Sequence, residues 1–234
     1  MTADASTRVA FLPSLGRYPN DFATLMTSVA SAGFEPVPVT FTTNGVRTLH
    51  DLAGQAAAAL GNAGPPAHVV GHALGNRIAR CLAADYPELV RSVTLLAAGG
   101  RVPPDDEAAV ALLNCFDTSL SAGDHLAAVA TAFSAPGNDA AVWADGWDGV
   151  LAEVQAAAVR ATSVDDWWTA GGTAPVLVIQ GLDDRVAPPG NGRDLVEQIG
   201  ERARLVELAD AGHALLPEQP AAIAAALLEF LSRC

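Results

Sequence analysis

Short apolar runs alternate with longer helical patterns along most of this chain, and no other feature restricts its fold as strongly. Strands that alternate with helices build a parallel sheet whose two faces are both covered. We therefore expect an α/β protein with a mostly parallel sheet of about six strands. The expected strands are residues 8–12, 36–41, 68–70, 92–96, 175–180 and 205–208. The expected flanking helices are residues 21–32, 49–60, 76–86, 191–199 and 220–231.

Residues 101–172 interrupt this alternation. They contain helical stretches and chain-breaking residues but no convincing strand. Ligands of open α/β sheets bind outside the carboxyl ends of the strands. We expect residues 101–172 to form a helical lid inserted over that edge, while residues 1–100 and 173–234 form the core.

The composition excludes several classes of protein. The chain has 234 residues, 50% of them hydrophobic and 17% charged, which suits one folded domain with an insertion. Its net charge is −13, and all 13 of its Lys and Arg side chains are arginines. A chain with this charge has no excess of basic residues to attract nucleic acids or anionic membranes. We therefore expect neither as a partner. Because lysine is absent, a Schiff-base lysine and a P-loop lysine are excluded.

The three cysteines, Cys81, Cys115 and Cys234, are far apart and include no C-x-x-C pair. This usage fits a reducing, cytoplasmic setting. The N-terminal residues lack the basic and apolar regions of a signal peptide, and no apolar run is long enough to cross a bilayer. We expect a cytoplasmic protein in which Cys115 is a buried, unreactive thiol.

Three short motifs each follow an expected strand: GHALG at 71–75, GLDDRVAP at 181–188 and DAGH at 210–213. In the first, Gly71 and Gly75 flank a sharp strand-to-helix turn where a side chain would collide with neighbouring backbone. Ala73, between them, is expected to adopt a strained backbone conformation that costs on the order of 1–3 kcal/mol. Alanine has no hydroxyl or thiol, so this turn presents no nucleophile.

In this order, and over nearly the whole chain, the three motifs resemble the α/β-hydrolase superfamily. The resemblance implies that Ala73 stands where the family usually has its serine nucleophile. It also implies that His213 is the general base and that Asp184 orients it, with Asp183 as the competing choice. Residues 96–100 (LAAGG) offer no alternative acid. The chain would begin at the family's third strand and form a shortened version of the fold.

The same resemblance implies an oxyanion hole made of two backbone N–H groups. One belongs to Leu74, at the start of the helix that follows the turn. The other belongs to Leu15, in the loop after the first strand, where Pro13 and Ser14 replace the usual His-Gly pair. The Ser14 hydroxyl is a further candidate donor. His72, beside the turn, is expected to be structural and to pack beneath it.

The four tryptophans, Trp143, Trp147, Trp167 and Trp168, all fall in the expected insertion. They form its own small core, an aromatic pocket above His213, or both, because tryptophan buries a large area and keeps a polar N–H. The other histidines are too scattered for a metal site. We expect a small apolar substrate, no metal and no cofactor. The candidate substrate-binding residues are Ser14, Phe116, Trp143, Trp147 and Trp168.

Several explanations of Ala73 stay open. An introduced Ser-to-Ala change would make the natural protein a serine hydrolase. A native alanine would leave His213 and Asp184 to activate water, or to remove a substrate proton while the Leu15 and Leu74 N–H groups hold an enolate. A ligand-binding protein without turnover is the third reading, and no other residue is a good candidate nucleophile.

We expect hydrolase-class chemistry on a small apolar ester-like or carbonyl substrate. The main alternative is a non-hydrolytic general-base enzyme, such as a lyase, isomerase, cyclase or cofactor-free oxygenase. An intact acid and base argue against pure binding, because a binding protein has no need of a paired imidazole and carboxylate.

Overall fold

The computed structural model describes residues 7–61 and 64–234, and this part of the chain contains a six-stranded sheet. The strand order is β2-β1-β3-β4-β5-β6, and every neighbouring pair is parallel. The predicted α/β fold is therefore confirmed. The strands are β1 (Arg8–Leu12), β2 (Glu35–Pro38), β3 (Ala67–His72), β4 (Val90–Leu96), β5 (Val176–Gly181) and β6 (Ala203–Leu208).

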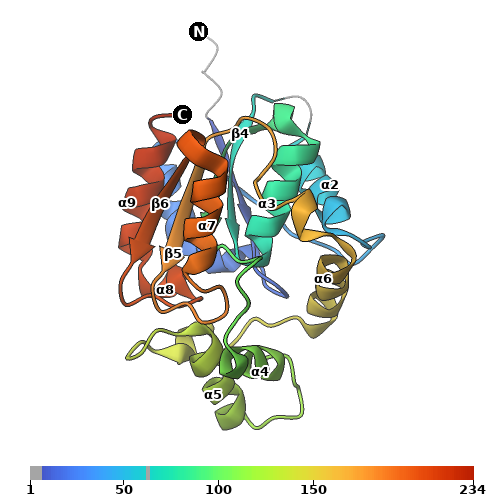
Figure 1. Cartoon of the computed structure of the whole chain (residues 1–234), viewed down its shortest axis with the longest axis vertical. Helices are drawn as coiled ribbons and strands as arrows, with labels where there is room; N and C mark the ends of the chain where they lie inside the picture. Colours follow the sequence, from blue (N-terminus) through green and yellow to red (C-terminus); the bar gives the residue numbers. More distant parts are fainter. Residues whose placement is uncertain (1–6, 62–63) are drawn as a thin grey trace.

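Helices cover both faces of this sheet (Figure 1). One face packs against α1 (Ala23–Ser31) and α9 (Pro220–Leu231). The opposite face packs against α2 (Leu49–Leu60), α3 (Leu74–Asp85) and α7 (Gly190–Ile199). A short helix that the sequence did not predict, α8 (Leu215–Glu218), precedes α9.

The side chains of β1 show how the sequence builds these two layers. Val9 and Phe11 belong to the core on the α1 and α9 side, whereas Ala10 and Leu12 belong to the core on the α2 and α3 side. Successive side chains of a strand point to opposite faces, so a strand that is buried on both faces is apolar throughout. The buried strand predicted at residues 8–12 is confirmed.

Four strands differ in length from the prediction, and two of them, β4 and β6, each begin two residues earlier than predicted. β2 ends at Pro38 rather than at residue 41. It is an edge strand, and its two prolines have no N–H to donate to a ladder. β3 runs past the predicted residue 70 through His72, because Gly71 and His72 stay in register with Leu95 and Leu96 of β4. α3 begins at Leu74, directly after the turn at Ala73 and earlier than the predicted residue 76.

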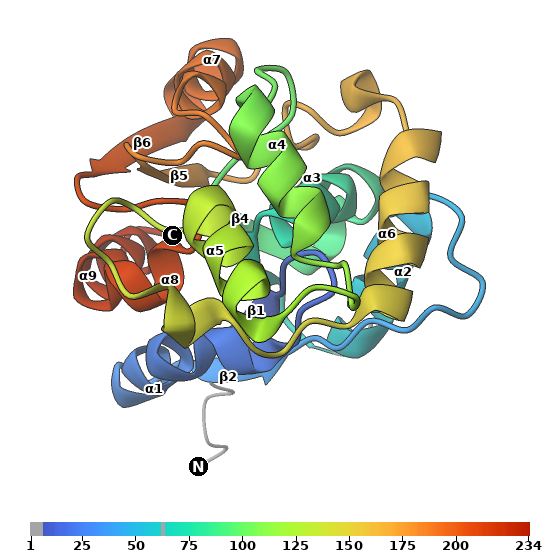
Figure 2. The same ribbon diagram turned by 90° about the horizontal axis from the view of Figure 1, so that it is seen from below.

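The chain between β4 and β5 contains α4 (Asp106–Asn114), α5 (Ala122–Phe133) and α6 (Gly149–Ala161). Asp105, Ser121 and Asp148 accept a backbone N–H of the first turn of these helices and thereby start them. Figures 1 and 2 show α4 and α5 beyond one end of the sheet, with α6 beside α2. That end is the carboxyl edge of the strands, since β4 leads into this segment.

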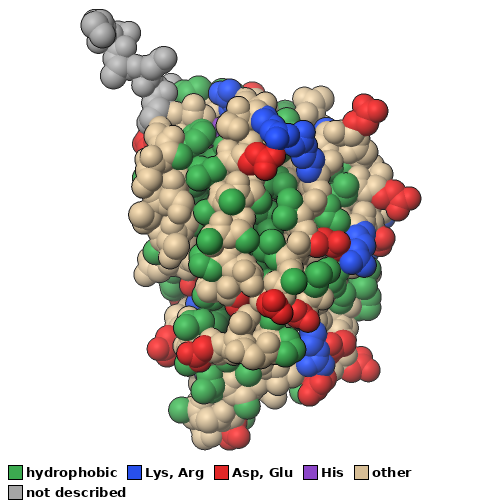
Figure 3. All heavy atoms as spheres, turned by 90° about the vertical axis from the view of Figure 1, so that its left-hand side faces the viewer, with side chains coloured by type: hydrophobic (Ala, Val, Ile, Leu, Met, Phe, Trp, Pro, Cys, Tyr) green, Lys and Arg blue, Asp and Glu red, His purple; other side chains and the backbone are tan. Residues whose placement is uncertain are grey.

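The charged side chains on the face drawn in Figure 3 are scattered, with arginines next to acidic residues. Among the described residues, no helix has the length and hydrophobicity needed to span a membrane. The predictions of no nucleic-acid partner and of a cytoplasmic location stay predictions. Residues 1–6, on which the absence of a leader was in part predicted, lie outside the described part of the chain.

Candidate active site

The turn between β3 and α3 is sharp and strained. Ala73 has φ 50° and ψ −108°, a left-handed backbone conformation that L-residues other than glycine adopt rarely. A Cβ on Gly71 would overlap the Gly75 carbonyl, and a Cβ on Gly75 would overlap the carbonyl of Leu12 in β1. The two glycines therefore let the backbone of α3 approach β1 closely, as the sequence predicted. The Ala73 methyl lies in the wall of a cavity.

The loop after β1 faces this turn across the cavity wall, which both Leu15 and Leu74 line. The loop is held from within by a bond from the Arg17 N–H to the Ser14 carbonyl, 3.1 Å long. In residues 7–61 and 64–234, the N–H groups of Leu15 and Leu74 donate to no protein acceptor. Two residues whose backbone N–H groups have no internal acceptor thus border one cavity, and their role as an oxyanion hole stays a prediction.

His213 and Asp184 come together from the turns after β6 and β5. The His213 Nδ1 lies 2.9 Å from Oδ2 and 3.1 Å from Oδ1 of Asp184. Both side chains are buried, with 5% and 2% exposure. Asp183 follows the same strand but makes no contact with the imidazole, and its N–H donates to the Ala211 carbonyl. The carboxylate beside His213 is therefore that of Asp184.

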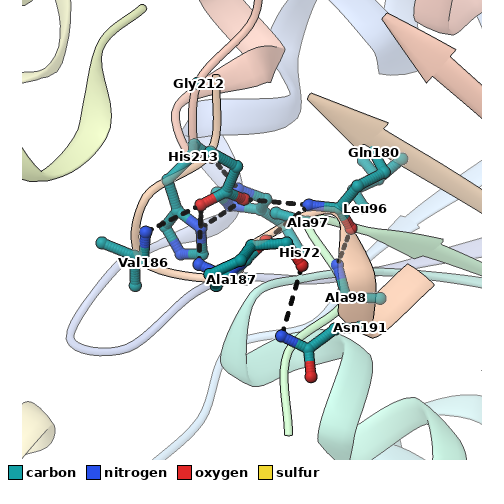
Figure 4. A network of polar contacts seen from close by, with 12 residues as sticks. His72, Leu96, Ala97, Ala98, Gln180, Val186, Ala187, Asn191, Gly212 and His213 are labelled. Atoms are coloured by element: carbon teal, nitrogen blue, oxygen red, sulfur yellow. Dashed lines mark hydrogen bonds and ion pairs between the residues drawn. The ribbon is translucent and has the colours of Figure 1, made fainter. Parts of the chain in front are cut away.

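Three protein donors hold the Asp184 carboxylate in place (Figure 4). The N–H groups of Val186 and Ala187 donate to Oδ1 at 3.0 and 2.7 Å. The Gln180 amide donates to Oδ2 at 3.2 Å and to the Ala187 carbonyl at 2.7 Å. Because the carboxylate is fixed on both oxygens, the imidazole that contacts it has a defined orientation.

His72 supports the backbone at His213. It is fully buried, and its Nε2–H donates to the His213 carbonyl at 2.8 Å. Burial, with the neighbouring His213 ring as a smaller cause, lowers the pKa of His72 to about 3. His72 is therefore neutral at physiological pH, which suits a donor to a carbonyl rather than an acid or base. It packs beneath the turn as expected.

The predicted residues largely share one cavity of about 240 Å³. Most of its wall is apolar, and α4, α5 and α6 contribute Leu112, Phe133, Ala156 and Val159. Cavities that bind small molecules are mostly apolar with a few polar groups. The predicted residues that line it are Ser14, Leu15, Ala73, Leu74, Phe116, Trp147 and His213.

Trp143 and Trp168 do not line this cavity, unlike Trp147. The Trp143 ring lies edge-on to His72 with centroids 5.7 Å apart, and the Arg17 guanidinium lies over it at 4.2 Å. Trp168 packs into the core on the α2 and α3 side, where it is 1% exposed. Both rings fill space between layers, which local sequence does not reveal.

Sequence reasoning did not find ten residues of the cavity wall: Arg77, Ala97, Gly99, Leu112, Phe133, Ala156, Val159, Arg160, Val186 and Ala187. Spacing could have revealed Arg77, which lies three residues after Leu74 on the same face of α3. Cys115, in contrast, is buried as predicted, and burial raises the pKa of its thiol to about 12. Such a thiol is not a nucleophile at neutral pH.

A parallel sheet with a sharp strand-to-helix turn, followed by an acid turn and a histidine turn at its carboxyl edge, is the architecture of an α/β-hydrolase. The sequence model of the alpha/beta hydrolase family matches residues 6–226, and the chain belongs to this family.

Individual relatives agree with this assignment. BpoC of Mycobacterium tuberculosis, which carries the name of a non-heme bromoperoxidase, is 29% identical over 194 aligned positions, covering 71% of this chain and 68% of BpoC. Its crystal structure matches 99% of this chain and 94% of its own with a TM-score of 0.79 at 23% identity.

A thermophilic esterase from Thermogutta terrifontis matches 97% of this chain and 90% of its own, with a TM-score of 0.75 at 17% identity. A protein of Acinetobacter baumannii that is described as a lipase matches 99% of this chain and 85% of its own, with a TM-score of 0.77 at 16% identity. At these identities the structural matches define the fold.

Proposed function

We propose that this protein is a hydrolase-class enzyme that acts on a small apolar ester-like or carbonyl substrate. His213 is the general base, Asp184 orients it, and the N–H groups of Leu15 and Leu74 form the oxyanion hole. One observation carries the proposal: the His213 ring borders the cavity while its Nδ1 lies 2.9 Å from the buried Asp184 carboxylate. That contact leaves Nε2 to exchange a proton with a bound reactant.

In this proposal Ala73 occupies the place of a serine nucleophile, so no acyl-enzyme forms. His213 takes a proton from a water molecule, and the resulting hydroxide attacks the substrate carbonyl. The Leu15 and Leu74 N–H groups stabilise the oxyanion. When it collapses, the C–O bond breaks and the proton on His213 passes to the departing alkoxide, which leaves as the alcohol. Asp184 stays ionised and stabilises the imidazolium.

The helical segment between β4 and β5 acts as a lid in this proposal. Phe116 and Trp147 from this segment form part of the cavity wall. A cover of apolar side chains excludes bulk water and strengthens the interactions between the substrate and the polar groups. The names of the relatives, which include an esterase and a lipase, support hydrolysis of an ester-like bond.

A second candidate is proton abstraction without hydrolysis. It is favoured by the Ala73 methyl, since the cavity has a base and two oxyanion donors but no nucleophile. Here His213 removes a proton next to a carbonyl, and the Leu15 and Leu74 N–H groups hold the enolate. This chemistry would not need a hydroxyl at residue 73.

Ala73→Ser tests the hydrolase proposal. We expect it to raise the rate of p-nitrophenyl butyrate hydrolysis by about 10²-fold or more, because the serine would complete a nucleophile, base and acid set. His213→Ala in that background should lower the rate by about 10²-fold or more. Asp184→Asn should also impair it, whereas the matched Asp183→Asn should not.

Two outcomes would contradict the proposal. If neither alanine nor serine at residue 73 supports ester cleavage, but His213→Ala abolishes conversion of a carbonyl compound, proton abstraction is the function. If ligands bind and substitutions of His213 and Asp184 change no turnover, the protein is a binding protein.

A further inference from the structure

Among the residues that the structure describes, two arginines and no acidic residue line the cavity. Arg77 comes from α3 and Arg160 from α6. The chain as a whole has 26 acidic residues against 13 arginines, so this wall is opposite in charge to the protein around it. A local positive charge in an acidic protein attracts and orients an anionic ligand.

Arg77 is the more buried of the two. It lies in the first turns of α3, on the same face as Leu74, and its guanidinium is 5.3 Å from the centroid of the Trp167 ring. Burial lowers its pKa from the ordinary value. Within residues 7–61 and 64–234, Arg77 forms no ion pair and no side-chain hydrogen bond.

The other buried arginines are fully partnered, which makes Arg77 exceptional among the described residues. Arg17 forms an ion pair with Asp21 at 2.8 Å and donates to the Asp145 carbonyl at 2.6 Å. Arg80 donates to Asn76 Oδ1 at 2.6 Å and to the Gly99 carbonyl at 2.9 Å. Arg77 borders the cavity and has neither a hydrogen-bond acceptor nor a carboxylate partner among the described residues.

Arg160 stands in the last turn of α6 and is exposed. No carboxylate of the described residues pairs with it, and it borders the cavity together with Ala156 and Val159. Its position on the exposed side of the wall suits attraction of an anion rather than tight binding, since solvent weakens an exposed charge pair.

The ring of Trp167 gives the partly buried Arg77 guanidinium a cation–π contact but accepts none of its N–H groups, so these donors have lost part of their hydration without gaining a hydrogen bond. A carboxylate restores these interactions, because its two oxygens match the planar guanidinium fork. Resting on the proposed function, we propose that the substrate carries a carboxylate that Arg77 binds, with Arg160 guiding it into the cavity. Its apolar body would contact Leu112 and Phe116, and its reacting carbonyl would lie at His213.

Binding calorimetry with a matched pair of ligands tests this inference without any need for turnover. The ligands are 4-phenylbutanoate and the neutral 4-phenylbutanamide, which have the same apolar body. At low salt we expect the acid to bind at least about tenfold more tightly than the amide, because a charge-assisted bidentate pair forms only with the acid. Added salt should lower the affinity for the acid and leave the affinity for the amide unchanged.

Variants assign this preference to Arg77. Arg77→Gln should lower the affinity for the acid about tenfold and change the affinity for the amide by no more than about twofold. The affinity of Arg77→Lys for the acid should lie between those of the unchanged protein and Arg77→Gln, because lysine keeps the charge but lacks the planar fork of donors. Arg160→Gln should weaken the acid only about two- to threefold. Arg101→Gln is the matched control, since Arg101 forms an exposed ion pair with Asp165 and does not line the cavity.

Equal affinity for acid and amide would overturn the inference. An equal loss of affinity for both ligands in Arg77→Gln would also overturn it, because Arg77 would then have a structural role. So would a loss of affinity for the acid in Arg101→Gln as large as in Arg77→Gln, because the effect would then reflect net charge alone. Turnover is measured separately with mono-p-nitrophenyl glutarate and p-nitrophenyl valerate in the Ala73→Ser background. If neither ester is cleaved while the acid preference persists, the hydrolase proposal fails and the carboxylate site stands.

Discussion

At the scale of single residues, Ala73 contributes to the site mainly through its backbone, which forms the turn between β3 and α3. Its left-handed conformation ends β3 and starts α3, and its N–H donates to the Leu96 carbonyl at 3.0 Å. The turn thereby places Leu74, the first residue of α3, in the wall of the cavity. This backbone conformation is strained, and it persists because the packing of β3 and α3 around it stabilises the fold by more than the strain costs.

Replacing Ala73 by glycine should therefore stabilise the protein. Glycine adopts a positive φ without strain, and this relief exceeds the extra flexibility that glycine gives to the unfolded chain. We expect the free energy of unfolding to rise by about 1 kcal/mol in urea titrations. The exposed helical control Ala127→Gly in α5 should lower it by about 1 kcal/mol. The same sign for both variants would show that residue 73 is not strained.

At the scale of elements, α6 supports the loop that carries Leu15. The Gln155 side chain of α6 is fully buried, and its Oε1 accepts the Gly16 N–H at 2.8 Å. The Asp148 N–H, at the start of the same helix, donates to the Gly16 carbonyl at 2.8 Å. A Cβ on Gly16 would lie 2.7 Å from the Asp148 carbonyl, so glycine lets the loop and α6 meet. The segment between β4 and β5 thus supports the loop after β1 and also contributes side chains to the cavity wall.

Gln155→Leu should loosen this attachment. Leucine has a similar size but leaves the Gly16 N–H without an acceptor, which costs about 1–3 kcal/mol of stability. We expect a loss in that range in urea unfolding, together with slower ester hydrolysis in the Ala73→Ser background. Glu153→Leu, on the exposed side of α6, should change stability by no more than about 0.5 kcal/mol. Equal effects of the two substitutions would argue against support of the loop by α6.

At the scale of the whole molecule, two buried histidines make the fold sensitive to acid. His68 in β3 is 1% exposed and lies 2.7 Å from the Ser92 hydroxyl, and burial lowers its pKa to about 4. The pKa of His72 is lowered to about 3 for the same reason. In the unfolded chain these histidines become protonated as the pH falls below about 6.5, whereas in the folded protein they stay neutral to a lower pH.

The free energy of unfolding should consequently fall as the pH falls below about 6.5. The unfolded state binds more protons in this window, so each histidine lowers stability by up to about 1.4 kcal/mol per pH unit, down to pH 4 for His68 and pH 3 for His72. Urea unfolding at pH 7, 6 and 5 measures this slope. His68→Gln should remove about half of it, and an unchanged slope in that variant would contradict the assignment.

Much of the fold could be predicted because its signals are local. Apolar runs marked the buried strands, and the Thr48 capping box set the start of α2, where the Thr48 and Asp51 side chains each accept the other's backbone N–H. Gly71 and Gly75 indicated a sharp turn, because a side chain at either position would overlap neighbouring backbone. The ends of β2 and β3 were less certain, since they depend on which neighbouring strand supplies partners.

The sequence by itself determined the order of the elements, the class of fold and the residues that follow each strand, because side-chain periodicity and chain breaks act between neighbours. Only the tertiary structure decided which aspartate contacts His213, that Trp143 and Trp168 turn away from the cavity, and that Arg77 and Arg160 share its wall. These facts depend on how distant segments pack, and packing sets distances that no local pattern encodes.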